Sequence, residues 1–275
     1  IFPMLLPKFF WGCLTGIALF ILSYHSPSQV QAQPLDKQSN SPDDGVYKVG
    51  YIPVKSPDLK PLEEITQESK LFEAIANELN KIFVLPTDIG IVLAECGQAN
   101  AFYTSEHRAI VVCYELMVDF ARFSSQYATS DQDIAQGMLG GTMYVFLHEL
   151  GHALIDVLNL PTVGREEDAV DQLATLVSVQ AGDLADEMTI IPALQYMVRS
   201  QETGTQNLPY WGEHSLDLQR YYNIMCLLYG SNPSKYSAIA TLAQLPGERA
   251  KRCPGEYQKA SDSWNRLLAP YLRSN

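Results

Sequence analysis

The strongest constraint on this fold is an apolar helical segment that carries three ionisable side chains. Helical spacing of apolar residues over 132–159 surrounds the motif His148-Glu149-Leu150-Gly151-His152 and predicts a largely buried helix. Ionisable groups are costly to bury unless a metal ion or charged partners compensate them. The fold therefore has to bring compensating groups to this one helix.

The spacing within the motif points to zinc. His148 and His152 are four residues apart, so both imidazoles leave the same helix face one turn apart. That arrangement lets both rings bind one tetrahedral zinc ion. Glu149 then lies beside the open coordination position, where it can take a proton from a zinc-bound water as general base. The alternative is a solvent-facing helix with two incidental histidines.

A second, acidic helix is predicted over 165–181, because Pro161 ends the first helix and a short turn follows. Catalytic zinc commonly takes a third protein ligand, and we expect Glu167 to supply it, with Glu166 and Asp168 as alternatives. Asp171, one turn further on, is expected to accept the second ring N–H of a ligating histidine. Helix N-terminal charge is the other explanation for the first acids.

The two motifs together resemble those of the gluzincin metallopeptidases, in which HExxH is followed by a helix bearing Glu-x-x-x-Asp. That resemblance implies that Glu167 is the third zinc ligand and that Asp171 supports a zinc-binding histidine. More closely, the chain is similar to a little-characterised family of exported bacterial proteins assigned as zinc metallopeptidases. The stretches that carry this similarity are FLHELGHALIDVLNLPTVGREEDAVDQLA, the segment from Cys96 to Tyr114 with NAFY and CYEL, WGEHSLDLQRYYNI, and CPGEY with SWNRLLAPYL. The short gap between the two motifs implies a compact version of the gluzincin fold.

The predicted function is therefore hydrolysis of peptide or protein substrates by a zinc-dependent metallopeptidase. His214 is a further candidate catalytic residue, because a histidine from a later helix can donate to the oxyanion. Its alternative is a capping or surface histidine. Two other functions stay open: a zinc hydrolase of non-peptide amides or esters, and a non-catalytic, zinc-stabilised exported binding protein. Glu149 argues against the second, because a structural zinc site has no use for a base.

The order of predicted elements indicates the α+β class. We expect a compact zincin-like domain in which a short antiparallel strand region precedes a mostly helical remainder. Strands are predicted over 46–53, 89–94 and 109–114, with a further short pairing segment over 100–103. Helices are predicted over 62–83, 132–159, 165–181, 183–201, 215–229, 234–244 and 255–272. By analogy with zinc peptidases, residues 101–103 or 109–113 could pair with an extended substrate, although an ordinary hairpin explains them equally well. Close helix packing explains the glycines that precede the motif, Gly137, Gly140 and Gly141.

The N-terminal segment predicts export. Lys8, the apolar run that follows it and the small residues ending at Ala32 are typical of a signal peptide over 1–32. Residues 33–45 are predicted to be a flexible linker, and 46–275 the catalytic domain. We expect a secreted or periplasmic protein without stable membrane insertion after cleavage. The alternative is a protein anchored to the membrane by its uncleaved leader.

Charge and cysteine content limit which partners this protein can bind and indicate the compartment in which it is found. Lys and Arg total 19 against 31 Asp and Glu, a net charge of −12, which argues against nucleic acid as a partner. Beyond the leader four cysteines remain, and an even count in an oxidising compartment suggests two disulfides. Three pairings are possible, and we favour the local one, which joins Cys96 to Cys113 and Cys226 to Cys253.

Overall fold

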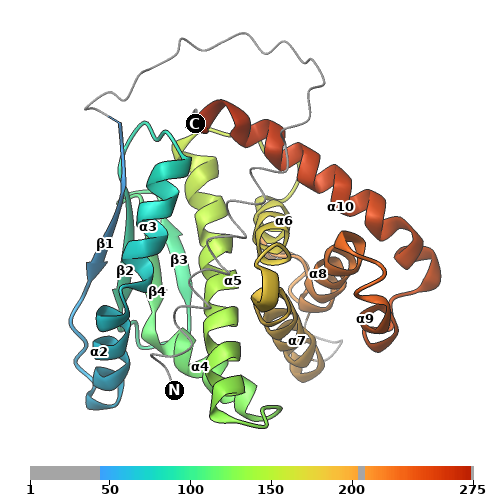
Figure 1. Cartoon of the computed structure of the whole chain (residues 1–275), viewed down its shortest axis with the longest axis horizontal. Helices are drawn as coiled ribbons and strands as arrows, with labels where there is room; N and C mark the ends of the chain where they lie inside the picture. The colour runs from blue at the N-terminus through green and yellow to red at the C-terminus, as the bar shows by residue number, and fades with distance from the viewer. Residues whose placement is uncertain (1–43, 204–207, 274–275) are drawn as a thin grey trace.

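A computed structural model describes residues 44–203 and 208–273 (Figure 1). The expected signal peptide over 1–32, and all but the last two residues of the expected linker over 33–45, lie outside the described residues. Within the described part of the chain, no helix is both long and apolar enough to cross a membrane.

The described residues form one four-stranded sheet in the middle of the N-terminal half. Its strands are β1 (Tyr47–Tyr51), β2 (Ile89–Ala94), β3 (Ala101–Thr104) and β4 (Ala109–Cys113). Their order in the sheet is β1-β2-β4-β3. β1 pairs with β2, and β2 with β4, in parallel, while β3 pairs with β4 antiparallel.

The expected α+β class is confirmed, but the expectation of antiparallel strands holds only for β3 and β4. Parallel neighbours need a crossover between them. Helices α2 (Lys60–Ser69) and α3 (Leu71–Ile82) supply it between β1 and β2. The chain then places β3 on the outside, so that β4 returns into the gap beside β2. β3 is therefore left as an edge strand.

The helices follow the predicted pattern with a few shifted boundaries. The single helix predicted over 62–83 breaks at Lys70, whose φ of 54° lies in the left-handed region. The last helix begins at Gly247 rather than at residue 255, because Pro254 is accommodated inside it. The remaining elements are α4 (Tyr114–Ser125), α5 (Asp131–Val157), α6 (Glu166–Ser178), α7 (Ala185–Thr203), α8 (Asp217–Ser231), α9 (Ser237–Leu242), α10 (Gly247–Leu268) and the 3-10 turns Pro57–Leu59, Gly182–Leu184 and Ala269–Tyr271.

Helix α5 lies at the centre of the molecule and carries the HELGH motif. It begins where the Ser130 hydroxyl accepts the backbone N–H of Asp133 at 3.2 Å, a typical N-terminal cap. In Figure 1, α5 stands between the sheet and the helical half formed by α6, α7 and α8. It packs against β3 on one side and against α4, α6 and α7 on the others. The motif is thus enclosed by elements from both halves.

Small residues let the neighbouring helices approach α5 closely. A Cβ at Gly141 would lie 2.3 Å from the Phe120 ring, and one at Gly140 would lie 2.7 Å from the backbone of Glu187. These distances are shorter than any real Cβ contact, so both positions require glycine at this packing distance. The expected role of these glycines in close helix packing is confirmed.

Two disulfides link elements that are near in sequence. Cys96 and Cys113 join the segment after β2 to the end of β4, and Cys226 and Cys253 join α8 to α10. The favoured local pairing is therefore confirmed. Paired cysteines are consistent with an exported protein.

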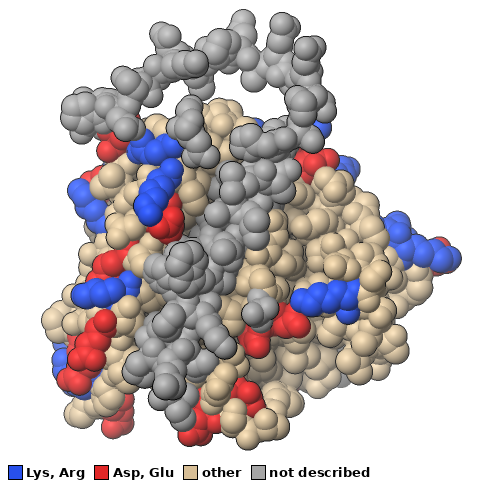
Figure 2. All heavy atoms as spheres, in the orientation of Figure 1, with Lys and Arg blue, Asp and Glu red and all other residues tan. Residues whose placement is uncertain are grey.

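On the face shown in Figure 2, acidic and basic side chains are intermixed.

Candidate metal centre

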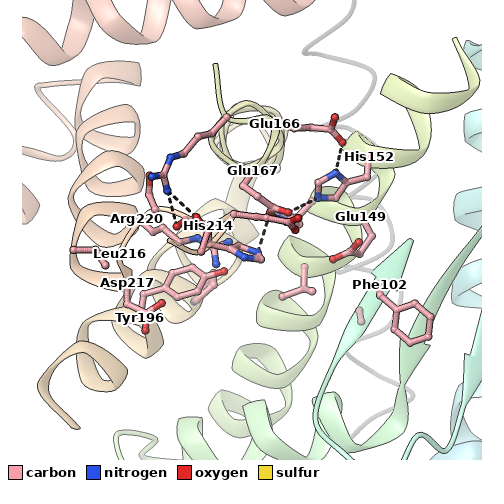
Figure 3. Close-up of a pocket in the computed structure, with 18 of the residues that line it drawn as sticks. Phe102, Glu149, His152, Glu166, Glu167, Tyr196, His214, Leu216, Asp217 and Arg220 are labelled. Carbon is pink, nitrogen blue, oxygen red and sulfur yellow. Dashed lines mark hydrogen bonds and ion pairs between the residues drawn. The ribbon is translucent and has the colours of Figure 1, made fainter. Parts of the chain in front are cut away.

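The packing of α6 against α5 brings the two sequence motifs together. Oε2 of Glu167 lies 3.1 Å from Nε2 of His148, and its Oε1 lies 3.4 Å from Nε2 of His152. A Cβ at Gly151, between the two histidines, would lie 2.7 Å from Val170 of α6. The absence of a side chain at Gly151 therefore allows α6 to lie close to the motif. Figure 3 shows Glu166 and Glu167 facing His152.

The other nitrogen of each histidine faces a different carboxylate. Nδ1 of His148 lies 2.8 Å from Oδ1 of Asp171, and Nδ1 of His152 lies 2.7 Å from Oε1 of Glu166. In a neutral imidazole, a carboxylate that accepts an N–H from Nδ1 leaves the lone pair of the ring on Nε2. Both rings then direct Nε2 toward the carboxylate of Glu167. Glu166 thus faces Nδ1 of His152, whereas its neighbour Glu167 faces the Nε2 atoms of both histidines.

Asp171 also forms a buried ion pair that sequence reasoning missed. Arg220, on α8, donates Nε to Oδ2 at 2.7 Å and Nη2 to Oδ1 at 2.8 Å, and its guanidinium lies 4.0 Å above the Tyr196 ring. Both charged groups are buried. Arg220 belongs to the WGEHSLDLQRYYNI stretch, but nothing in its spacing indicates a partner on α6.

The carboxylates set the charge state of the cluster. Burial by itself raises the pKa of Glu167 and of Asp171, but hydrogen bonds from the histidines, together with Arg220 for Asp171, lower both well below the usual range. Burial lowers the pKa of His148, yet its hydrogen bonds to Asp171 and Glu167 outweigh burial and raise it to about 9. The cluster therefore concentrates negative charge that attracts a proton or another cation.

Glu149 lies beside this cluster and faces the sheet. Its Oε2 accepts the backbone N–H of Tyr103 at 2.8 Å, and the Tyr103 hydroxyl donates to Asp156 at 2.6 Å. In Figure 3, Glu149 lies between His152 and the strand that carries Phe102. Burial raises the pKa of Glu149 above its ordinary value. This carboxyl can therefore take up a proton more readily than an exposed one.

His214 reaches the cluster from the segment that precedes α8. Its Nε2 lies 2.9 Å from Oε2 of Glu167, and its ring is parallel to that of His148, with 6.2 Å between centroids. The helix predicted to begin at residue 215 begins at Asp217, so His214 precedes its N-cap, Leu216. About half of the His214 side chain is exposed. The structure thus brings all six of the predicted site residues into one region.

A family model described as "Putative metallopeptidase" (DUF4344) matches residues 51–268. The chain belongs to this family. Membership implies a metal ion and a peptide or protein substrate. No curated protein and no solved structure matches the chain.

Two groups of potential metal ligands occur among the described residues of this metallopeptidase family member. Donor atoms of His148, Glu167 and His214 lie within 4.8 Å of one another. The other group contains Cys96 and Cys113, whose sulfurs are already joined in a disulfide and so cannot bind a metal as thiolates. Of these two groups among the described residues, only the histidine group offers free donors, and His152, which is not in it, adjoins it with Nε2 3.4 Å from Oε1 of Glu167.

The residues present fit a zinc ion. At 3.1 and 3.4 Å from the Glu167 carboxylate, the two Nε2 atoms either donate hydrogen bonds to it or, when deprotonated, need a cation between them and the carboxylate. His148, His152 and Glu167 supply two nitrogens and one oxygen, a ligand set that zinc accepts in catalytic sites. The carboxylates on both Nδ1 atoms are the partners that ligating histidines usually have.

A cleft of about 1700 Å³ opens over this centre. Its walls come from β3, α5, α7 and the segment between α7 and α8, and the metal-centre residues line it. Phe102 of β3 is 40% exposed at its edge. Glu149, His148 and His152 are among the residues that line this cleft.

Proposed function

We propose that this chain is a zinc-dependent metallopeptidase and that His148, His152 and Glu167 hold the zinc ion. The observation that carries the proposal is the convergence of both Nε2 atoms on Glu167, at 3.1 and 3.4 Å. Three protein ligands leave a fourth position for the reaction, as in catalytic zinc sites. Asp171 and Glu166 fix the orientation of the two rings.

The residues around this centre can carry the protons of peptide hydrolysis. When bound, zinc supplies a Lewis acid that makes water more acidic and polarises a carbonyl. Glu149 acts as general base, and its raised pKa lets it hold the proton until the leaving amine takes it. Tyr103 holds Oε2 of Glu149 through its backbone N–H, so Oε1 can face the reacting atoms. His214, whose Nε2 lies 2.9 Å from Oε2 of Glu167, is close enough to the centre to donate to the oxyanion.

The edge strand favours a peptide over a non-peptide amide or ester. β3 pairs with β4 on one side, and residues 101–103 line the cleft. Apart from the Tyr103 N–H, which Glu149 accepts, the outer edge of β3 offers backbone groups to an extended peptide. A non-peptide hydrolase would have no use for this edge. A non-catalytic zinc protein would have no use for Glu149.

We further propose that residues 46–275 form the catalytic domain of an exported protein, secreted or periplasmic, whose leader over 1–32 is removed. The two disulfides support an oxidising compartment.

Replacement of the general base tests the peptidase. Purified wild type, Glu149→Gln and a control, Glu106→Gln in the exposed turn between β3 and β4, are compared for bound zinc and for cleavage of a peptide library. We expect all three to bind one zinc ion and Glu149→Gln to lose activity by at least about a hundredfold. Zinc-loaded wild type without peptide cleavage contradicts the peptidase, and activity on amide or ester substrates then identifies the alternative hydrolase. Equal activity in Glu149→Gln contradicts the assigned base.

A further inference from the structure

The segment that carries His214 has no regular structure to hold it. Residues 208–216 lie between α7 and α8, and none of them is buried. Within the segment, backbone hydrogen bonds join Tyr210 to Leu208 and Gly212 to Pro209, and the next regular element begins only at Asp217. Packing alone therefore does not determine where the imidazole of His214 lies.

Arg165 ties this segment to the helix of the metal centre. Its Nη1 donates to the carbonyl oxygen of His214 at 2.8 Å and to that of Gly212 at 3.4 Å. Arg165 is the N-cap residue of α6, directly before Glu166 and Glu167. One side chain thus links the backbone on either side of Glu213 to the helix end that holds the carboxylates of the centre.

The residues around these hydrogen bonds provide little other attachment. Residues 161–165 are exposed, as is His214 itself, so apolar burial between the two segments is small. The guanidinium is a planar group with several donors, and it can serve two carbonyl oxygens at once. His214 Nε2 then reaches Oε2 of Glu167 at 2.9 Å, and its ring lies parallel to that of His148.

We propose that Arg165 is a positioning residue: it holds the backbone of His214 so that the imidazole faces the metal centre. This inference rests on the proposed function, because it assigns His214 to the oxyanion. Arg165 itself acts through His214 and does not bind zinc. Without Arg165, the segment over 208–216 samples other conformations, and the fraction of molecules with His214 in place falls. Misplacement of a catalytic group by about 1 Å can lower a rate a hundredfold.

The first test measures order rather than activity. Hydrogen exchange is followed by mass spectrometry in wild type, Arg165→Ala, Arg165→Lys and a control, Arg252→Ala on the exposed side of α10, with and without added zinc. We expect peptides covering 208–216 to exchange about tenfold faster in Arg165→Ala than in wild type, and at an intermediate rate in Arg165→Lys. Exchange in Arg252→Ala should match wild type. Unchanged exchange of this segment in Arg165→Ala overturns the proposal. Thermal unfolding shows whether the variants are folded.

The second test asks whether Arg165 acts through His214. For zinc-loaded protein, kcat on a cleaved reporter peptide is measured for Arg165→Ala, His214→Ala and the double variant, along with zinc affinity. We expect about a tenfold loss from Arg165→Ala in wild type, recovered in part by Arg165→Lys, and none in the His214→Ala background. Zinc affinity stays unchanged. An equal loss in both backgrounds overturns positioning. An inactive wild type instead contradicts the proposed function, and the exchange experiment then decides about Arg165 alone.

Discussion

Nδ1 of His148 and Oδ1 of Asp171 lie 2.8 Å apart, and this contact joins the HELGH helix to a buried ion pair with Arg220. Asp171 therefore orients a histidine ring and neutralises a buried guanidinium at the same time. The two tasks can be separated experimentally, because only one of them involves the metal centre.

We expect Asp171→Asn to affect both tasks. Loss of the charge leaves Arg220 buried without a partner, which costs about 3–5 kcal/mol of unfolding free energy in the metal-free protein. It also weakens the hold on His148, so zinc affinity falls about 10–100-fold. Urea unfolding measures the first effect, and competition with a zinc-binding dye measures the second.

The matched variant replaces both members of the ion pair. Asp171→Leu with Arg220→Met removes both buried charges, so we expect it to recover most of the lost stability. Zinc affinity should stay low, because His148 still lacks its acceptor. A double variant as unstable as Asp171→Asn, or one with wild-type zinc affinity, would contradict this division of roles.

The three successive acids at the start of α6 should respond differently to loss of charge. Glu167 faces both Nε2 atoms, so Glu167→Gln should abolish stoichiometric zinc binding. Glu166 accepts Nδ1 of His152 at 2.7 Å, so Glu166→Gln should weaken zinc binding by about tenfold. Asp168→Asn serves as the control and should bind zinc as wild type does. Isothermal titration of the apo-proteins with zinc measures all three, and unchanged affinity in Glu167→Gln would rule out the proposed ligand.

The contact between α4 and α5 should not tolerate one added methyl group. The Cβ of Gly141→Ala would meet the Phe120 ring at 2.3 Å, so we expect a loss of about 1–3 kcal/mol of stability. In a Phe120→Ala background the same change should cost almost nothing. Gly255→Ala, in the middle of α10 with open space around it, should instead stabilise the protein by up to about 1 kcal/mol. Denaturant unfolding of the four variants checks the prediction, and an equal cost of Gly141→Ala in both backgrounds would refute the contact.

The bond between Cys226 and Cys253 should stabilise the C-terminal helices. It closes a loop of 27 residues, and the chain-entropy model gives about 3–4 kcal/mol for such a loop. We therefore expect the double alanine variant to unfold at lower urea concentration than wild type. Reduced wild type provides the comparison, after allowance for the second disulfide. An unchanged midpoint in the double variant would mean that α8 and α10 are held by packing alone.

Features that depend on short sequence distances could be predicted from the chain. The period of the α-helix places His148 and His152 on one face whatever surrounds them. The local disulfides and the close-packed glycines before the motif follow for a similar reason, because neighbouring segments have few ways to meet. The α+β class follows from the order of strand-like and helical patterns.

Features that depend on how distant segments meet came only from the tertiary structure. Spacing favoured Glu167 but could not exclude Glu166 or Asp168 as the acid that faces Nε2, because a small rotation of α6 would exchange them. Spacing also could not indicate that β2 and β4 pair in parallel, because this depends on β3 lying at the edge of the sheet, outside β4. Arg220 lies 49 residues beyond Asp171 in the sequence. Arg165 lies at the N-terminal end of α6 and contacts the segment that carries His214. Helix periodicity thus determined the motif, while the docking of α6 and α8 onto α5 decided which groups surround it.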